Sequence, residues 1–180
     1  MNRLLEALRT AEGNAALDVR DGAVSCEDTS IRSMSFNLLV HNMTEARVGR
    51  VLTMIRKHLP DTLGVQEASE EWMAALRDGL GTEYASVGVG RDAGGSGEHS
   101  AIFYRRALFE VEESGTRWLT GTPDTVSRVD GSICNRIFTY AILRRRTDGK
   151  RFLCVNTHTD HAKDPAVRLA QVQALTAFLE

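Results

Sequence analysis

Strand and helix patterns alternate between residues 31 and 80, and this alternation limits the fold more than any other feature of the chain. Ile31–Val40 and Thr62–Glu67 have the apolar, partly alternating composition of strands. Thr44 and Ser69 are candidate N-caps of two helices, which end near residues 58 and 80. This strand–helix–strand–helix order is typical of a layered α/β domain.

A β-hairpin is predicted in the second half of the chain. Apolar runs at 133–146 and 150–158 flank the dipeptide Asp148-Gly149, which is a strong signal for a two-residue turn. That register places Thr139 opposite His158. Both faces of the two strands are apolar, so we expect the sheet to be covered on both sides.

Further strands are expected at 84–89, 98–105 and 108–118, and a last helix begins at Asp164-Pro165. The expected fold is therefore a layered α/β sandwich with mixed sheets. We expect one domain over residues 31–180, preceded by a leader or loose edge segment at 1–30. Two polar loops, at 90–97 and 119–132, are candidates for selecting a substrate.

The composition is that of an ordinary globular protein, with 42% hydrophobic and 26% charged residues. The formal net charge is −2, so no broad basic field marks the chain as a nucleic-acid coat. A small phosphorylated molecule, or a nucleic acid held at one point, remains compatible with this charge.

Cysteine usage and hydropathy indicate a cytoplasmic protein. Cys26, Cys134 and Cys154 are widely spaced and form no metal or redox motif. No apolar run reaches the length of a membrane span. Glu6 and Arg9 interrupt the first ten residues, which therefore lack the apolar core of a signal peptide.

Polar residues with a possible role in a site stand within or just after three predicted strands. His158 follows the apolar run FLCVN, and Glu67 ends the buried-type strand TLGVQE. A carboxylate there is costly to bury unpaired, so Glu67 either faces solvent or serves a metal or a base. Asn37, in the first strand, either closes a turn or joins the same site.

Four segments in this order resemble one known family. They are SFN at 35–37, VQE at 65–67, EHSAIFYR at 98–105 and NTHTDH at 156–161, supported by GTRWLTGTPD at 115–124 and NRIFTYA at 135–141. Together they resemble the endonuclease/exonuclease/phosphatase superfamily, which has a deoxyribonuclease-I-like fold. Within it, the bacterial branch of small predicted hydrolases is the most similar. The resemblance runs from about Ile31 to Glu180.

The resemblance implies hydrolysis of phosphoester bonds, usually with Mg²⁺ and with Mn²⁺ as an alternative ion. Glu67 would be the metal ligand, and Asn37 would hold the phosphate or the water shell of the metal. His158 would hydrogen-bond a phosphate oxygen and assist proton transfer. Glu98 matches the carboxylate that orients this histidine, fixing its tautomer and favouring the imidazolium.

Two further residues are expected to bind substrate. Arg136 matches a position near the scissile phosphate, although the predicted hairpin register places it on the face opposite His158. Asn156 precedes the histidine by two positions. The alternative for Asn156 is hydrogen bonding at the strand end.

The later motifs of the family, G-D-x-N and S-D-H, do not occur in the 180 residues. We therefore expect a fold truncated before its second half, which lacks one of the two stacked sheets and exposes an apolar face. Hydrolysis by such a chain would be impaired. The alternative is a non-catalytic remnant or partner-binding fragment that oligomerises through the uncovered sheet.

Overall fold

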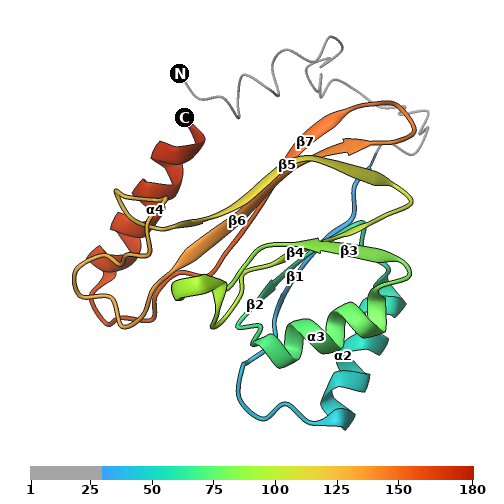
Figure 1. Cartoon of the computed structure of the whole chain (residues 1–180), viewed down its shortest axis with the longest axis horizontal. Helices are drawn as coiled ribbons and strands as arrows, with labels where there is room; N and C mark the ends of the chain where they lie inside the picture. The colour runs from blue at the N-terminus through green and yellow to red at the C-terminus, as the bar shows by residue number, and fades with distance from the viewer. Residues whose placement is uncertain (1–29) are drawn as a thin grey trace, which may run out of the picture.

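The computed structural model describes residues 30–180, so the predicted segment at 1–30 lies almost entirely outside the described residues. Two sheets stack face to face, and helices lie on the outside of the stack (Figure 1). The elements are β1 Ser33–Asn37, α2 Glu45–His58, β2 Thr62–Gln66, α3 Glu70–Leu80, β3 Tyr84–Val87, the 3-10 turn η1 Ala93–Gly95, β4 Ile102–Arg105, β5 Phe109–Trp118, β6 Ile137–Arg145, β7 Arg151–Thr157 and α4 Pro165–Leu179. The predicted layered α/β sandwich with mixed sheets is confirmed.

The first sheet has the strand order β1-β2-β4-β3, in which β1 and β2 are parallel and the other pairs are antiparallel. Helix α2 makes the crossover between the parallel strands. Both predicted N-caps form: the side-chain oxygen of Thr44 accepts from the backbone of Arg47, and that of Ser69 from the backbone of Trp72. Fully buried residues such as Trp72 and Ile55 join the two helices to the outer face of this sheet.

The second sheet has the order β5-β6-β7, and the hairpin between β6 and β7 differs from the prediction. Thr139 pairs with Asn156 instead of His158, and the loop spans 146–149. Gly149 has a φ of 70° and donates its N–H to the carbonyl of Arg145, so the chain makes a wider turn than a two-residue one. The register shift is even, so the predicted faces are unchanged.

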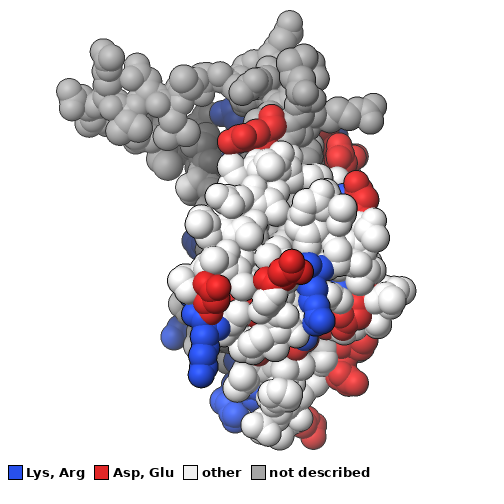
Figure 2. Space-filling model, turned by 90° about the vertical axis from the view of Figure 1, so that its left-hand side faces the viewer, with Lys and Arg blue, Asp and Glu red and all other residues white. Residues whose placement is uncertain are grey.

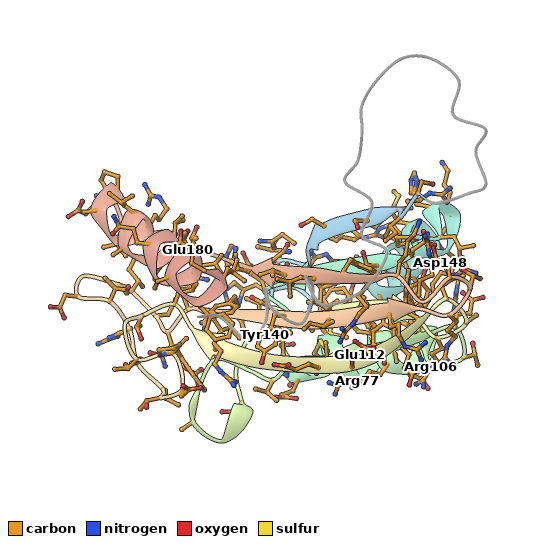
Figure 3. The ribbon with its side chains drawn as sticks, turned by 90° about the horizontal axis from the view of Figure 1, so that it is seen from above. Arg77, Arg106, Glu112, Tyr140, Asp148 and Glu180 are labelled. Atoms are coloured by element: carbon orange, nitrogen blue, oxygen red, sulfur yellow. The ribbon has the colours of Figure 1, made fainter. Side chains whose placement is uncertain are left out.

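Both faces of the second sheet are covered, as their apolar composition predicted. The inner face packs Phe109, Leu143 and Phe152 against the first sheet. On the outer face, the ring of Phe138 meets the ring of Phe178 in α4 edge-on at a centroid distance of 5.0 Å. Figure 3 shows α4 lying beside this sheet, near the labelled Tyr140.

The expectation that one of the two stacked sheets would be missing is wrong, since the described residues form both. The exposed apolar area lies elsewhere, between the two sheets at their edge strands β1 and β7. A groove of about 450 Å³ opens there, lined partly by Met34, Phe152 and Cys154. In the part of the chain that the structure describes, each of these strands is paired on one side only.

Candidate functional site

Side chains from the ends of β1, β2 and β7 meet at one edge of the molecule. Asn37 is the last residue of β1 and pairs with Gln66, which places it beside Glu67. The Asn37 amide nitrogen donates to Oε1 of Glu67 at 2.9 Å. Nε2 of His158 lies 3.5 Å from the same carboxylate oxygen. The structure therefore brings together three of the predicted site residues, although they are far apart in the sequence.

Glu67 occupies a strained backbone position. Its φ is 53°, in the left-handed region that non-glycine residues rarely adopt. Burial raises the pKa of its carboxyl group, but the hydrogen bonds from Asn37 and from the backbone of Val40, with the charges of His158 and Arg136, outweigh this and lower the pKa. Glu67 is therefore ionised at neutral pH and aimed at His158.

The imidazole of His158 is half-buried. Burial and the charge of Arg136 lower its pKa below the ordinary 6.5, and the carboxylates of Glu67 and Glu98 only partly oppose this. His158 is therefore mainly neutral at pH 7. The charge of Glu98 does favour the imidazolium, but burial and the charge of Arg136 outweigh it.

Glu98 lies near His158 but has a different hydrogen-bond partner. Its Oε2 accepts from Nη1 of Arg91 at 2.9 Å, in an ion pair that is mostly shielded from solvent. Sequence reasoning missed Arg91, which lies in the glycine-rich loop between β3 and β4. The indole N–H of Trp118 donates to the Arg91 carbonyl and fixes the loop over the site. The Glu98–Arg91 pair takes the place of the expected contact with His158.

Arg136 lines the same cavity as His158, so its predicted placement on the opposite face is wrong. The physical reason is that Arg136 precedes β6, which begins at Ile137, and the alternation of a strand does not govern its direction. The side chain is 5% exposed. The cavity is narrow and is lined by Glu67, Arg91, Glu98, His99, Ser100, Asn135, Arg136, Ile137 and His158.

Asn156 does not face this cavity. Its amide nitrogen donates to the carbonyls of Val65 at 2.8 Å and Ala101 at 2.9 Å, and its oxygen accepts from the side chain of Gln66 at 2.6 Å. Gly64 leaves room for it, since a Cβ there would lie 2.7 Å from Asn156 Cγ. This geometry supports the strand-end alternative: Asn156 ties the second sheet to the first.

The oxygen atoms at the site suit a hard divalent cation that takes few of its ligands from the protein. Within residues 30–180 no group of three or more His, Cys, Asp or Glu side chains is arranged to hold a metal. Glu67 nevertheless presents an oriented, ionised carboxylate. Mg²⁺ is commonly bound through one or two carboxylates, with water and substrate phosphate as the other ligands. Asn37 orients this carboxylate, while its own oxygen accepts from the backbone of Leu39.

No protein-family model and no curated protein matches the sequence, but solved structures do. The endonuclease/exonuclease/phosphatase from Bacteroides vulgatus is 35% identical, with a TM-score of 0.76 over 82% of this chain and 59% of that chain. A family protein from Bacteroides thetaiotaomicron is 31% identical, with a TM-score of 0.73 over 83% and 58%. The mannosyl-6-phosphatase of Bacteroides thetaiotaomicron is 30% identical, with a TM-score of 0.74 over 83% and 59%.

A mixed sheet stacked on an antiparallel sheet, with helices outside and a polar site at the strand ends, defines an α/β sandwich of the deoxyribonuclease-I-like type. The chain belongs to the endonuclease/exonuclease/phosphatase superfamily, as predicted, and represents part of its fold. It spans 58–59% of the length of the three relatives. Within residues 30–180, no helix is long and apolar enough to cross a membrane.

Proposed function

We propose that the chain supplies the metal and proton-transfer half of a phosphoester hydrolase that depends on Mg²⁺ or Mn²⁺. The observation that carries this proposal is the contact of Glu67 with both Asn37 and His158 at the joined strand ends. Arg136 adds a buried positive charge to the same cavity. An anion, a cation and a proton can thus be held within one small space.

The residues present can perform the following steps. Glu67 would hold the divalent cation, which supplies charge neutralisation at the phosphate oxygens. Neutral His158 can accept a proton from the attacking water, or donate a hydrogen bond to a phosphate oxygen, depending on its tautomer. Arg136 binds an anionic oxygen of the substrate. Asn37 keeps the Glu67 carboxylate in place.

We propose a phosphorylated small molecule as the substrate. The mannosyl-6-phosphatase, at 30% identity, is named for such a compound. The face drawn in Figure 2 shows acidic and basic side chains interspersed, without the continuous basic field that a long nucleic acid requires. A nucleic acid held at one phosphate is the other substrate class compatible with the site.

We also propose that hydrolysis by the 180-residue chain alone is weak. The matched relatives are longer, and neither G-D-x-N nor S-D-H occurs here. When several groups act together in catalysis, removing one of them lowers the catalytic rate by orders of magnitude. The open groove at β1 and β7 is where additional chain could complete the sandwich.

Metal binding is tested by the effect of Mg²⁺ on the melting temperature. For the wild type we expect an upward shift, because a ligand of the folded state at about 100 times its Kd stabilises by about 2.7 kcal/mol. Glu67→Gln should abolish the shift. Glu70→Gln should retain it, since Glu70 is exposed in the first turn of α3.

A wild type that shows no Mg²⁺ or Mn²⁺ shift would contradict the proposal and favour the partner-binding alternative. A full shift in Glu67→Gln would place the cation elsewhere. Oligomerisation through the open groove belongs to that alternative, and sedimentation of the same samples measures it.

A further inference from the structure

Asp160 is a buried carboxylate just beyond the site, and its oxygens are fully used. Its side chain is 0% exposed. Oδ1 accepts from the backbone of Ala162 at 2.8 Å and of Ile133 at 3.3 Å, and Oδ2 accepts from the backbone of Cys134 at 3.3 Å. Asp160 therefore joins the segment after β7 to the segment before β6.

The same carboxylate holds Arg136. Nε of Arg136 donates to Oδ2 of Asp160 at 3.4 Å, and Nη2 lies 3.0 Å from Nδ1 of His161. Among the described residues, no hydrogen-bond partner is found for the third nitrogen, Nη1. Because the side chain is 5% exposed and lines the cavity with His158, this nitrogen is the one left for a ligand.

The carboxyl group of Asp160 is ionised at neutral pH. Burial raises its pKa, but the backbone N–H groups of Cys134, Ala162 and Ile133, with the Arg136 charge, outweigh this and lower the pKa to about 2. The loop is also tied to α4, since the Asp160 backbone N–H donates to Gln171 at 2.8 Å. Asp160 therefore forms a fixed support for the guanidinium of Arg136.

We propose that Asp160 is a positioning residue: it fixes the guanidinium of Arg136 so that Nη1 binds an oxygen of the substrate phosphate. The inference rests on the proposed function for the identity of the anion, and it goes beyond it by assigning a role to a residue outside the cavity. If Asp160 only shaped the turn, its three hydrogen bonds from backbone N–H groups would be sufficient. If it positions Arg136, its contact with the guanidinium is required as well.

The proposal is tested by binding of inorganic phosphate, measured calorimetrically at neutral pH. Asp160→Asn keeps the size of the side chain but replaces one accepting oxygen by an NH₂ group. An NH₂ group cannot accept a hydrogen bond from Nε of Arg136 or from the backbone N–H groups, and the negative charge that holds Arg136 is also lost. We expect it to weaken phosphate binding about tenfold, as does loss of one hydrogen bond to a charged group. Arg136→Met should weaken binding at least as much, and the double variant no further than Arg136→Met alone.

A spectroscopic readout separates positioning from folding. The Arg136 Nε–H should give a slowly exchanging ¹⁵N-edited NMR signal in the wild type that is lost in Asp160→Asn. Should Asp160→Asn fail to fold, His161→Ala replaces it: His161 is exposed and contacts Nη2 only, so we expect a smaller loss of phosphate binding that also disappears in the Arg136→Met background.

Unchanged phosphate affinity in folded Asp160→Asn, or in His161→Ala where it replaces that variant, overturns the proposal, as do additive losses in the double variant. Failure of the wild type to bind phosphate overturns it too. Binding without any turnover leaves the inference standing and counts against the proposed hydrolase alone, because the assay requires neither metal nor reaction.

Discussion

His158→Ala should lower the Mg²⁺-dependent hydrolysis of p-nitrophenyl phosphate by about 10²–10⁴-fold, the usual contribution of a positioned general acid or base. The physical reason is the neutral imidazole of His158 beside the ionised carboxylate of Glu67. Even a slow wild-type rate allows the comparison, because the release of p-nitrophenol can be followed for hours. His58→Ala is the matched control, since His58 is exposed at the end of α2.

The pH profile sharpens this prediction. Because burial and Arg136 lower the pKa of His158, the rate should fall only as the pH drops below the ordinary histidine value of 6.5. That acid limb should be absent in His158→Ala. A limb that survives in the variant, or a rate equal to the wild type, would show that His158 takes no part in the reaction.

Phe138→Ala should destabilise the protein by about 3–5 kcal/mol, the range for removing a buried aromatic ring. Phe138 is 0% exposed at the centre of the second sheet, and its ring meets Phe178 of α4 edge-on. The free energy of unfolding is measured by urea denaturation. The loss combines the transfer of the ring into water with the cavity left beneath the helix.

Leu169→Ala is the control on α4. Leu169 is 59% exposed, so its truncation should change the free energy of unfolding by less than about 0.5 kcal/mol. If Phe138→Ala were as mild as this control, α4 would not cover the sheet in solution. The outer face of β6 would then be a second open apolar surface.

The local signals in the sequence predicted most of the first sheet and half of the site. Thr44 and Ser69 cap their helices because a side-chain oxygen satisfies backbone N–H groups within three residues, which sequence shows directly. The meeting of Asn37 with Glu67 follows from the parallel pairing of β1 and β2, because such strands end at the same edge.

The features that sequence did not predict depend on contacts between distant segments. The face on which Arg136 lies was predicted wrongly, because the residue stands one position outside β6, where strand alternation stops. The pairing of Glu98 with Arg91 depends on how the loop after β3 folds back, which no local pattern specifies. Asn156 looks like a site residue by its neighbours along the chain, yet its side chain turns to the first sheet.

The hairpin illustrates how a strong local signal can give a wrong register. Asp148-Gly149 predicts a two-residue turn, but Asp148 accepts hydrogen bonds from the side chain of Arg145 and the backbone of Lys150. These bonds, with the left-handed Gly149, stabilise the longer loop. The change in register affects the site. Thr139 pairs with Asn156, so His158 lies beyond the end of β7 instead of opposite Thr139.

The central claim is that Asn37, Glu67 and His158 surround one divalent cation at the joined strand ends. Titration with paramagnetic Mn²⁺, followed by NMR line broadening, tests it without requiring catalysis. We predict that the first signals to broaden are the Asn37 side-chain amide, the Glu67 backbone N–H and the His158 ring. Broadening that begins at Asp148, at the opposite end of β7, or that affects all signals equally, would contradict the claim.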